Sequence, residues 1–401
     1  MSPEFTMRRD AGCVPRANAD RSPARGARFP LARIALSCAA FACLAAGCAS
    51  PPVKKDAAVP FPPPPELPRL MFLTSFNGLK SIEEQSSFNR FVVGEQQDVR
   101  LSKPYGVALH DGKIYVCDTN ATVMVFDVRN RKYAALKGAV GAGRLAQPIN
   151  VSVGADGEKY VADPGRGQVV VFDRNDDYVK AYGFDGKWRP VDAVAYRERL
   201  YVADIGNNIV RVFDRASGQP VGTVGDKGKP EERVDRPTNL AVDGDGMLYV
   251  TDASRFEVLK FGPDGTLKGV VGGPGDGYGR FARPKGIALD AQKRLYAVDA
   301  SFANVQVFNR DGRLLMYFGG GGKNPGNLTL PAKVTIDYDD VPYYRQYAPA
   351  DFEIEYLVVV TSQFGDRLVN VYGYGHAKGK TYPSDDELQK QLDERRKAET
   401  K

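Results

Sequence analysis

Side chains that commonly carry catalysis or bind transition metals are scarce in this sequence. Its 401 residues include five Cys, one Trp and only two His, which are His110 and His376. A zinc site built from several His is therefore not expected. The sequence also lacks a Cys-x-x-Cys-His haem attachment, a Gly-x-Ser-x-Gly nucleophile motif and a phosphate-binding loop. These absences argue against zinc, covalent haem, serine-hydrolase and nucleotide chemistry.

An excess of charge of one sign is also lacking once the N-terminal segment is set aside. The net charge is +6, but residues 1–47 hold seven Arg against three acidic residues, so the remainder is close to balance. Domains that bind nucleic acid carry a marked excess of Lys and Arg. We therefore expect no nucleic acid as a partner.

The chain has no apolar run of membrane-spanning length. Residues 34–46 are apolar except for Ser37 and follow several Arg. Such a run is too short for a transmembrane helix but has the length of a signal-peptide apolar region. Residues 48–68 follow and are rich in proline, which favours an extended, semi-rigid spacer.

The apolar run ends in Leu-Ala-Ala-Gly before Cys48, and this junction resembles a bacterial lipoprotein cleavage box. The resemblance implies a signal peptide over residues 1–47 and a diacylglycerol on Cys48, which would anchor an exported protein to a membrane. Ala49 follows the Cys, and the family's sorting pattern then implies the outer membrane of the cell envelope. The alternative is an ordinary signal peptide with an incidental cysteine.

The body of the chain is a sixfold repeat with a period of 42–47 residues. Each unit begins with a proline-led apolar segment, and the first five then carry a Tyr-x-x-Asp element. Segments ending in an aromatic residue and in glycine follow. Four short β-rich elements per period are typical of propeller blades. The six segments begin at Pro104, Pro148, Pro190, Pro237, Pro284 and Pro331.

The unit over residues 284–309 reads Pro-x-Gly-Ile-Ala-Leu-Asp, then Leu-Tyr-x-x-Asp, then Asn-Val-Gln-Val-Phe-Asn, and it resembles the NHL repeat. The resemblance extends over residues 70–373 and implies an all-β, six-bladed propeller spanning residues 69–375. The sixth unit lacks its outermost strand. Residues 69–78 have the pattern to supply that strand, which would close the ring. We therefore expect the propeller to be a monomer.

Two further patterns concern packing and the C-terminal tail. The Asp of the Tyr-x-x-Asp element recurs in five units, which indicates a structural role in organising the adjacent loop. Cys117 takes a position held by small residues in the other units, so we expect it to fill space in the core. Residues 376–401 form a charged tail, in which Ser384 and Glu387 make a capping box for a helix.

A candidate ligand site lies at the channel mouth, where the third residue of each proline-led segment should point. Four of these residues are polar: Asn150, Asp192, Asn239 and Lys333. Propellers resembling the gluconolactonase and paraoxonase group hold calcium with Asn, Asp and Glu in this region. Asn150, Asp192 and Asn239 are thus a candidate calcium site. No matching Glu is present, and these residues alternatively cap turns or bind water.

A candidate docking surface lies in the insertion between Asp337 and Tyr356. Aromatic residues with an Arg among them are typical of protein contact surfaces. The alternative is a local plug that packs on its own blade. The candidate docking residues are Tyr343, Tyr344, Arg345, Tyr347 and Phe352.

These patterns favour a binding protein over an enzyme. The leading hypothesis is a lipid-anchored scaffold for a protein or polysaccharide of the cell envelope, which needs no cofactor. Similar lipoproteins occur beside exported multihaem cytochromes, so cytochrome assembly is one context. The alternatives are a calcium-dependent hydrolase or lactonase working in the channel, and a sensor of a small ligand.

Overall fold

The computed structural model describes residues 58–82, 98–118, 122–183 and 186–399, all within one compact unit, Pro52–Lys401. Cys48 and the signal peptide expected over residues 1–47 lie outside the described residues, so those assignments stay predictions. Among the described helices, none combines the length and the apolar character that crossing a membrane requires.

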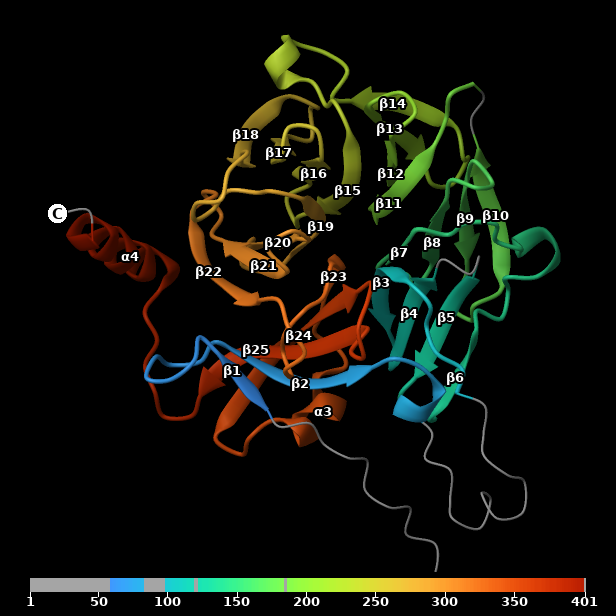
Figure 1. Cartoon of the computed structure of the whole chain (residues 1–401). Coiled ribbons are helices and arrows are strands. Elements are labelled where there is room, and N and C mark those ends of the chain that lie inside the picture. The colour runs from blue at the N-terminus through green and yellow to red at the C-terminus, as the bar shows by residue number, and fades with distance from the viewer. Residues whose placement is uncertain (1–57, 83–97, 119–121, 184–185, 400–401) are drawn as a thin grey trace, which may run out of the picture. The chain divides into compact units, whose positions relative to one another are not determined.

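Six antiparallel sheets surround a central axis, which confirms the predicted six-bladed propeller (Figure 1). Blade 1 contains β3 (Pro104–His110), β4 (Lys113–Asp118), β5 (Thr122–Asp127) and β6 (Lys132–Ala135). Blade 2 contains β7 (Asn150–Val153), β8 (Lys159–Asp163), β9 (Gln168–Phe172) and β10 (Tyr178–Gly183). Blade 3 contains β11 (Pro190–Tyr196), β12 (Arg199–Asp204), β13 (Ile209–Asp214) and β14 (Pro220–Val224).

The remaining blades continue the ring. Blade 4 contains β15 (Pro237–Val242), β16 (Leu248–Asp252), β17 (Glu257–Phe261) and β18 (Leu267–Gly272). Blade 5 contains β19 (Pro284–Leu289), β20 (Leu295–Asp299), β21 (Asn304–Phe308) and β22 (Leu314–Gly319). Blade 6 contains β23 (Pro331–Asp337), β24 (Phe352–Ser362), β25 (Val369–Ala377), β2 (Leu70–Phe76) and β1 (Val59–Phe61).

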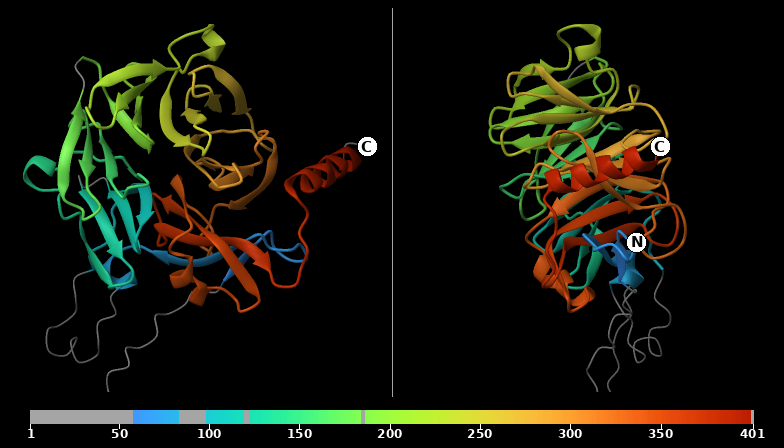
Figure 2. Two further views of the ribbon diagram at one scale, coloured as in Figure 1. Left: turned by 180° about the vertical axis from the view of Figure 1, so that it is seen from behind. Right: turned by 90° about the vertical axis from the view of Figure 1, so that its left-hand side faces the viewer.

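The first strand of every blade lines the axis, and all six begin at the same end of the ring, which we call the upper face. Turns between first and second strands lie at the opposite end, the lower face, because the strands of a blade are antiparallel. Asp111 and Gly112 make such a turn in blade 1, both with positive φ (49° and 75°), as a two-residue hairpin requires. Figure 2 shows the ring from behind and from its side.

Apolar side chains fill the space between neighbouring blades. One cluster joins Tyr115 and Val123 of blade 1 to Val161 and Phe172 of blade 2, and Cys117 lies inside it with no exposed surface. Both faces of a blade are thus buried, which explains why its strands read as apolar runs rather than alternating ones. The predicted packing role of Cys117 is confirmed.

Blade 6 is closed by the N-terminal strand, as predicted. β2 pairs antiparallel with β25, placing Leu70 opposite Tyr374 and Phe76 opposite Val369. β1 then pairs with the outer edge of β2, with Phe61 opposite Leu70. The spacer expected over residues 48–68 therefore includes a fifth strand of the propeller. Its prolines suggested an extended spacer, and proline is compatible with an edge strand because one side of that strand makes no ladder hydrogen bonds.

The remaining helices are short. They are η1 (Leu79–Ser81), η2 (Gly141–Gly143), η3 (Pro230–Glu232), α3 (Val341–Tyr344), η4 (Arg345–Tyr347) and the C-terminal α4 (Asp385–Glu399). The predicted capping box at α4 is confirmed, since the Glu387 carboxylate accepts from Ser384 N at 2.8 Å and Glu387 N donates to Ser384 Oγ at 3.3 Å. Figures 1 and 2 show α4 outside the ring of blades.

Candidate functional site

The predicted channel residues meet at the axis, where an ion pair bridges the ring. Lys333 Nζ of blade 6 lies 2.7 Å from Asp192 Oδ2 of blade 3. Blades follow one another around the ring in sequence order, so blades 3 and 6 are opposite each other. Both side chains are almost fully buried. The pair therefore closes the channel at this level, which we call the throat.

Hydrogen-bond donors surround the carboxylate of Asp192. Its Oδ2 accepts from Lys333 Nζ and from Leu240 N at 3.0 Å, and its Oδ1 accepts from Ala193 N at 3.0 Å. Asn239 Nδ2 lies 3.4 Å from Oδ2, and Asn150 Nδ2 donates to Val191 O at 2.7 Å. The negative charge at the throat is thus already compensated inside the chain.

This arrangement does not fit a calcium ion as it stands. The predicted ligand set has one carboxylate, and the Lys333 ammonium lies where a cation would bind it. Within the described residues, no three His, Cys, Asp or Glu side chains are grouped as metal ligands would be. Asn150 Oδ1 and Asn239 Oδ1 are nevertheless buried without a hydrogen-bond donor. The calcium hypothesis rests on these two oxygens alone and stays a prediction.

The repeated Asp of blades 1 to 5 binds the backbone amide of the residue that opens the upper face. In blade 1, Asp118 Oδ1 accepts from Lys103 N at 3.0 Å, and in blade 3 Asp204 Oδ1 accepts from Arg189 N at 3.0 Å. Asp252 and Asp299 bind the corresponding amides of blades 4 and 5 in the same way. The predicted loop-organising role of these Asp residues is confirmed.

Sequence reasoning missed what those loops present, which is a ring of cations at the upper face. The residue just before the first-strand proline is basic in four of the six blades, and this pattern is readable from the sequence. Three of the side chains are exposed and that of Lys103 is half-buried. None of the four makes an ion pair among the described residues. The ring consists of Lys103, Arg189, Arg236 and Arg283.

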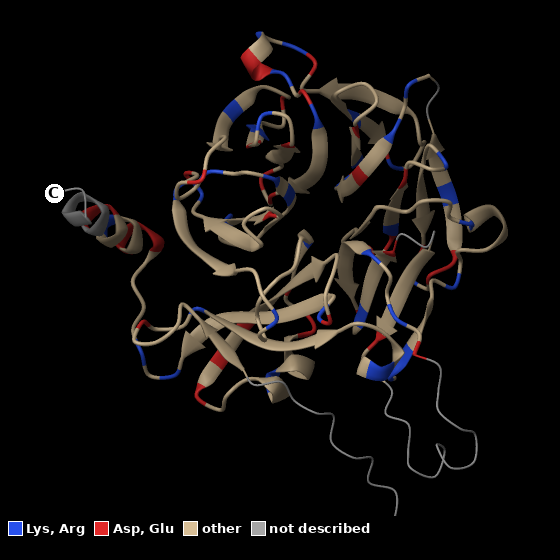
Figure 3. Cartoon of the chain, viewed as in Figure 1, with Lys and Arg blue, Asp and Glu red and all other residues tan. Residues whose placement is uncertain are grey.

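Lys285 adds a partly desolvated cation to this ring. Its Nζ lies 3.3 Å from Tyr105 Oη and 4.6 Å from the centre of the Tyr105 ring. Burial, reinforced by the nearby charges of Arg283 and Lys103, lowers the pKa of Lys285 to about 8. Burial and the Asp192 charge raise the pKa of Tyr105 to about 12. Basic and acidic residues are otherwise interspersed over the blades (Figure 3).

The candidate docking residues of the insertion differ in how far they are exposed to solvent. Tyr344 and Phe352 are buried, and both belong to a cluster with Val341 and Leu109 of blade 1. These two residues pack as the plug that the alternative predicted, because the insertion covers the junction of blades 6 and 1. Tyr343 and Tyr347 are half-buried and Arg345 is exposed. The docking hypothesis therefore retains only these three side chains.

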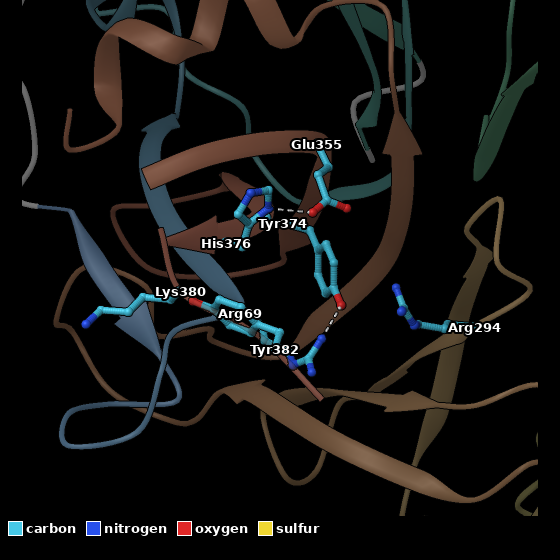
Figure 4. A pocket seen from close by; sticks show the side chains of 8 residues that line it. Arg69, Arg294, Glu355, Tyr374, His376, Lys380 and Tyr382 are labelled. Carbon is cyan, nitrogen blue, oxygen red and sulfur yellow. Dashed lines mark hydrogen bonds and ion pairs between the residues drawn. The ribbon is translucent and has the colours of Figure 1, made fainter. Parts of the chain in front are cut away.

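A polar pocket of about 260 Å³ lies where the closing strand meets the tail (Figure 4). Arg69 Nη1 lies 3.4 Å from Tyr374 Oη, and its Nη2 donates to Pro383 O at 2.5 Å. Tyr382 Oη donates to Pro68 O at 2.9 Å. His376 Nδ1 lies 2.9 Å from Glu355 Oε1 and remote from the throat. The hydrogen bonds from Arg69 to Pro383 and from Tyr382 to Pro68 thus hold the tail against the N-terminal segment beside this pocket.

Comparison with known proteins concerns the fold. No protein-family model matches the chain, and a search of curated proteins by sequence gives no match either. A protein of unknown function from Bacteroides thetaiotaomicron has a TM-score of 0.53 at 14% identity and covers 75% of each chain.

A gluconolactonase from Xanthomonas campestris has a TM-score of 0.50 at 16% identity, covering 80% of this chain and 98% of its own. At such identities the likeness extends to the architecture alone. The chain is a six-bladed β-propeller with an ion pair bridging its throat and a basic residue opening the upper face in four of its blades.

Proposed function

We propose that this protein is an exported, lipid-anchored scaffold of the cell envelope that binds an anionic partner, protein or polysaccharide, on its upper face. The observation that carries the proposal is the ring of unpaired cations around a throat closed by its own ion pair. Unpaired cations that share one surface attract an anionic partner and fix its orientation. A metal-dependent reaction centre at the throat would instead need a carboxylate that is not already paired with Lys333.

Attachment to the membrane follows from the predicted lipid on Cys48. In this proposal the lipid holds the propeller at the envelope surface, on the side where the N-terminal strand enters blade 6. Replacing Cys48 with Ala should release the protein from membranes into the soluble fraction. Retention of the Cys48→Ala variant in washed membranes would contradict the anchor.

The binding experiment compares two fourfold variants of the acylated protein in detergent-solubilised envelopes. One replaces Lys103, Arg189, Arg236 and Arg283 with Gln at the upper face. The matched control replaces four exposed basic residues at or beside the lower-face turns, Lys132, Arg174, Arg197 and Arg199. We expect the wild type and the control to retain a stoichiometric, salt-sensitive partner that the upper-face variant loses. Equal recovery by the two variants would refute the upper-face site.

A second candidate is a calcium-dependent hydrolase or lactonase acting at the throat. The observation in its favour is the pair of buried amide oxygens, on Asn150 and Asn239, that have no donor. Calorimetric titration of the dialysed protein with calcium, in the wild type and in Lys333→Met, tests it. Stoichiometric calcium binding, together with a hydrolase or lactonase activity that is lost in Asp192→Asn, would favour the enzyme over the scaffold.

A further inference from the structure

An apolar groove runs along the outer rim of blade 5, away from the throat and the upper-face ring. Its volume is about 760 Å³. All six residues of β22 line it, together with Phe61 and Leu67 of the N-terminal segment and Leu388 and Leu392 of α4. Tyr278 and Tyr317 also line it and are 70% and 52% exposed. Exposed aromatic side chains beside a hollow are typical of binding surfaces.

The floor of this groove is a sheet edge. β22 is the outermost strand of blade 5, and only its inner side pairs, with β21. Gly320 N donates to Ala303 O, so in the antiparallel register the N–H and C=O of Tyr317 and Gly319 point away from β21. In the described part of the chain, neither α4 nor the N-terminal segment makes a hydrogen bond to these groups. An open edge of this kind is a template for another strand.

The neighbouring blade provides a precedent within the same chain. Blade 6 carries β1 as a fifth strand on the outer edge of β2, with Val59 opposite Phe72 and Phe61 opposite Leu70. The Phe61 ring lies 6.3 Å from Phe318 of β22. The residues after Phe61 then form one wall of the groove. The place that a fifth strand of blade 5 would take therefore has protein on two sides, and no described strand occupies it.

We propose that β22 binds an extended segment of a partner protein, which adds to blade 5 as a fifth strand. Main-chain hydrogen bonds to Tyr317 and Gly319 would provide affinity, and alternate apolar side chains would enter the groove. Six residues of β22 correspond to an extended segment roughly 20 Å long. Leu388 and Leu392, one helical turn apart on α4, supply the apolar wall opposite the N-terminal segment. This surface is separate from the upper face and goes beyond the proposed function.

The repeat supplies a matched pair of variants. Val270 of β18 precedes Tyr317 by one 47-residue period and is 44% exposed. Its backbone also points away from the inner neighbour, because Gly273 N donates to Phe256 O in the same register. Proline at either position removes an outward N–H and leaves the blade's own hydrogen bonds intact. Tyr317→Pro should therefore block an added strand, whereas Val270→Pro should not.

The probe is a displayed library of random octapeptides, selected on the purified wild-type protein. We expect enriched peptides with alternating apolar residues that lose at least tenfold in affinity on Tyr317→Pro and keep it on Val270→Pro. Methylation of alternate peptide nitrogens should abolish binding, and bound peptide should slow amide exchange at Tyr317 and Gly319. A double replacement of Leu388 and Leu392 with Ser, which leaves the blade untouched, should also weaken binding.

The proposal would be overturned by peptides that respond equally to the two proline variants, by helical or purely acidic binders, or by enrichment of no peptide. Thermal unfolding of each variant ensures that loss of binding is not loss of the fold. If Tyr317→Pro does not fold, the Leu388→Ser/Leu392→Ser variant decides the question, and unchanged affinity in it would refute the groove.

Discussion

Replacing Lys333 with Met should destabilise the propeller strongly, because it leaves the carboxylate of Asp192 buried without its counter-charge. Removing one partner of a buried ion pair costs about 3–5 kcal/mol. Asp192 keeps two backbone N–H donors in the variant, so we expect the lower end, about 3 kcal/mol. For a domain of this size that corresponds to a fall in Tm of about 4–5 °C. Urea unfolding followed by the fluorescence of buried Trp188 measures it.

Two controls separate this explanation from general sensitivity to mutation. The double variant Asp192→Asn/Lys333→Met removes both charges and should recover to within about 1 kcal/mol of the wild type. Lys293→Met breaks the exposed pair with Asp245 and should cost less than about 1 kcal/mol. A cost of Lys333→Met no larger than that of Lys293→Met, or a double variant no more stable than the single one, would show that the unpaired Asp192 charge is not the cause.

Three further predictions concern the upper face, the loops and the closing strand. The pKa of Lys285 is about 8 in the native protein and near 10.5 when unfolded, so between these pH values the unfolded chain binds the extra proton. The stability of the wild type relative to Lys285→Met should therefore rise from pH 8 to pH 10.5, and a flat difference in unfolding free energy would contradict the shift. Asp252→Ala removes the acceptor of Asp235 N at 2.6 Å and Arg236 N at 3.1 Å and should cost roughly 3 kcal/mol in urea unfolding. Asp252→Asn keeps one acceptor oxygen and should lower the unfolding free energy by less. An equal loss in the two variants would mean that the charge of Asp252, and not its hydrogen bonds, stabilises the loop. Phe72→Ala empties a fully buried site beside Tyr372 and should cost about 3–5 kcal/mol, seen as a lower Tm. A loss below about 1 kcal/mol would mean that β2 contributes little to closing the ring.

The sequence predicted the architecture well because the architecture is repetitive. Each proline and each Tyr-x-x-Asp element carries the same local information, and its recurrence distinguishes a blade from an isolated hairpin. The closing strand was predictable for the same reason, since residues 69–78 match the pattern that the sixth unit lacks. Local patterns that recur thus determine both the number of strands and their order.

The site was less predictable because it depends on contacts across the ring. Asp192 and Lys333 occupy equivalent positions in their repeats, yet their pairing requires opposite blades at a suitable distance. The composition of the insertion suggests docking, but whether Tyr344 faces solvent or the core depends on how the loop returns to blade 1. β1 was missed because proline-rich composition masks an edge strand of three residues.

The closure of blade 6 also determines the order in which this chain can finish folding. Arg69 and Tyr374, which are hydrogen-bonded beside the closing strand, are 305 residues apart. β2 can pair early with β1, but its other partner, β25, is missing until nearly the whole chain has been made. The hydrogen bond from Tyr382 to Pro68 forms later still. The entropy of closing so long a loop grows only slowly with its length, but the contact is highly non-local and is expected to form slowly. A chain that stops before β25 would leave β2 and β24 as open edges, so the final stage of synthesis is when association between incomplete chains is most favoured.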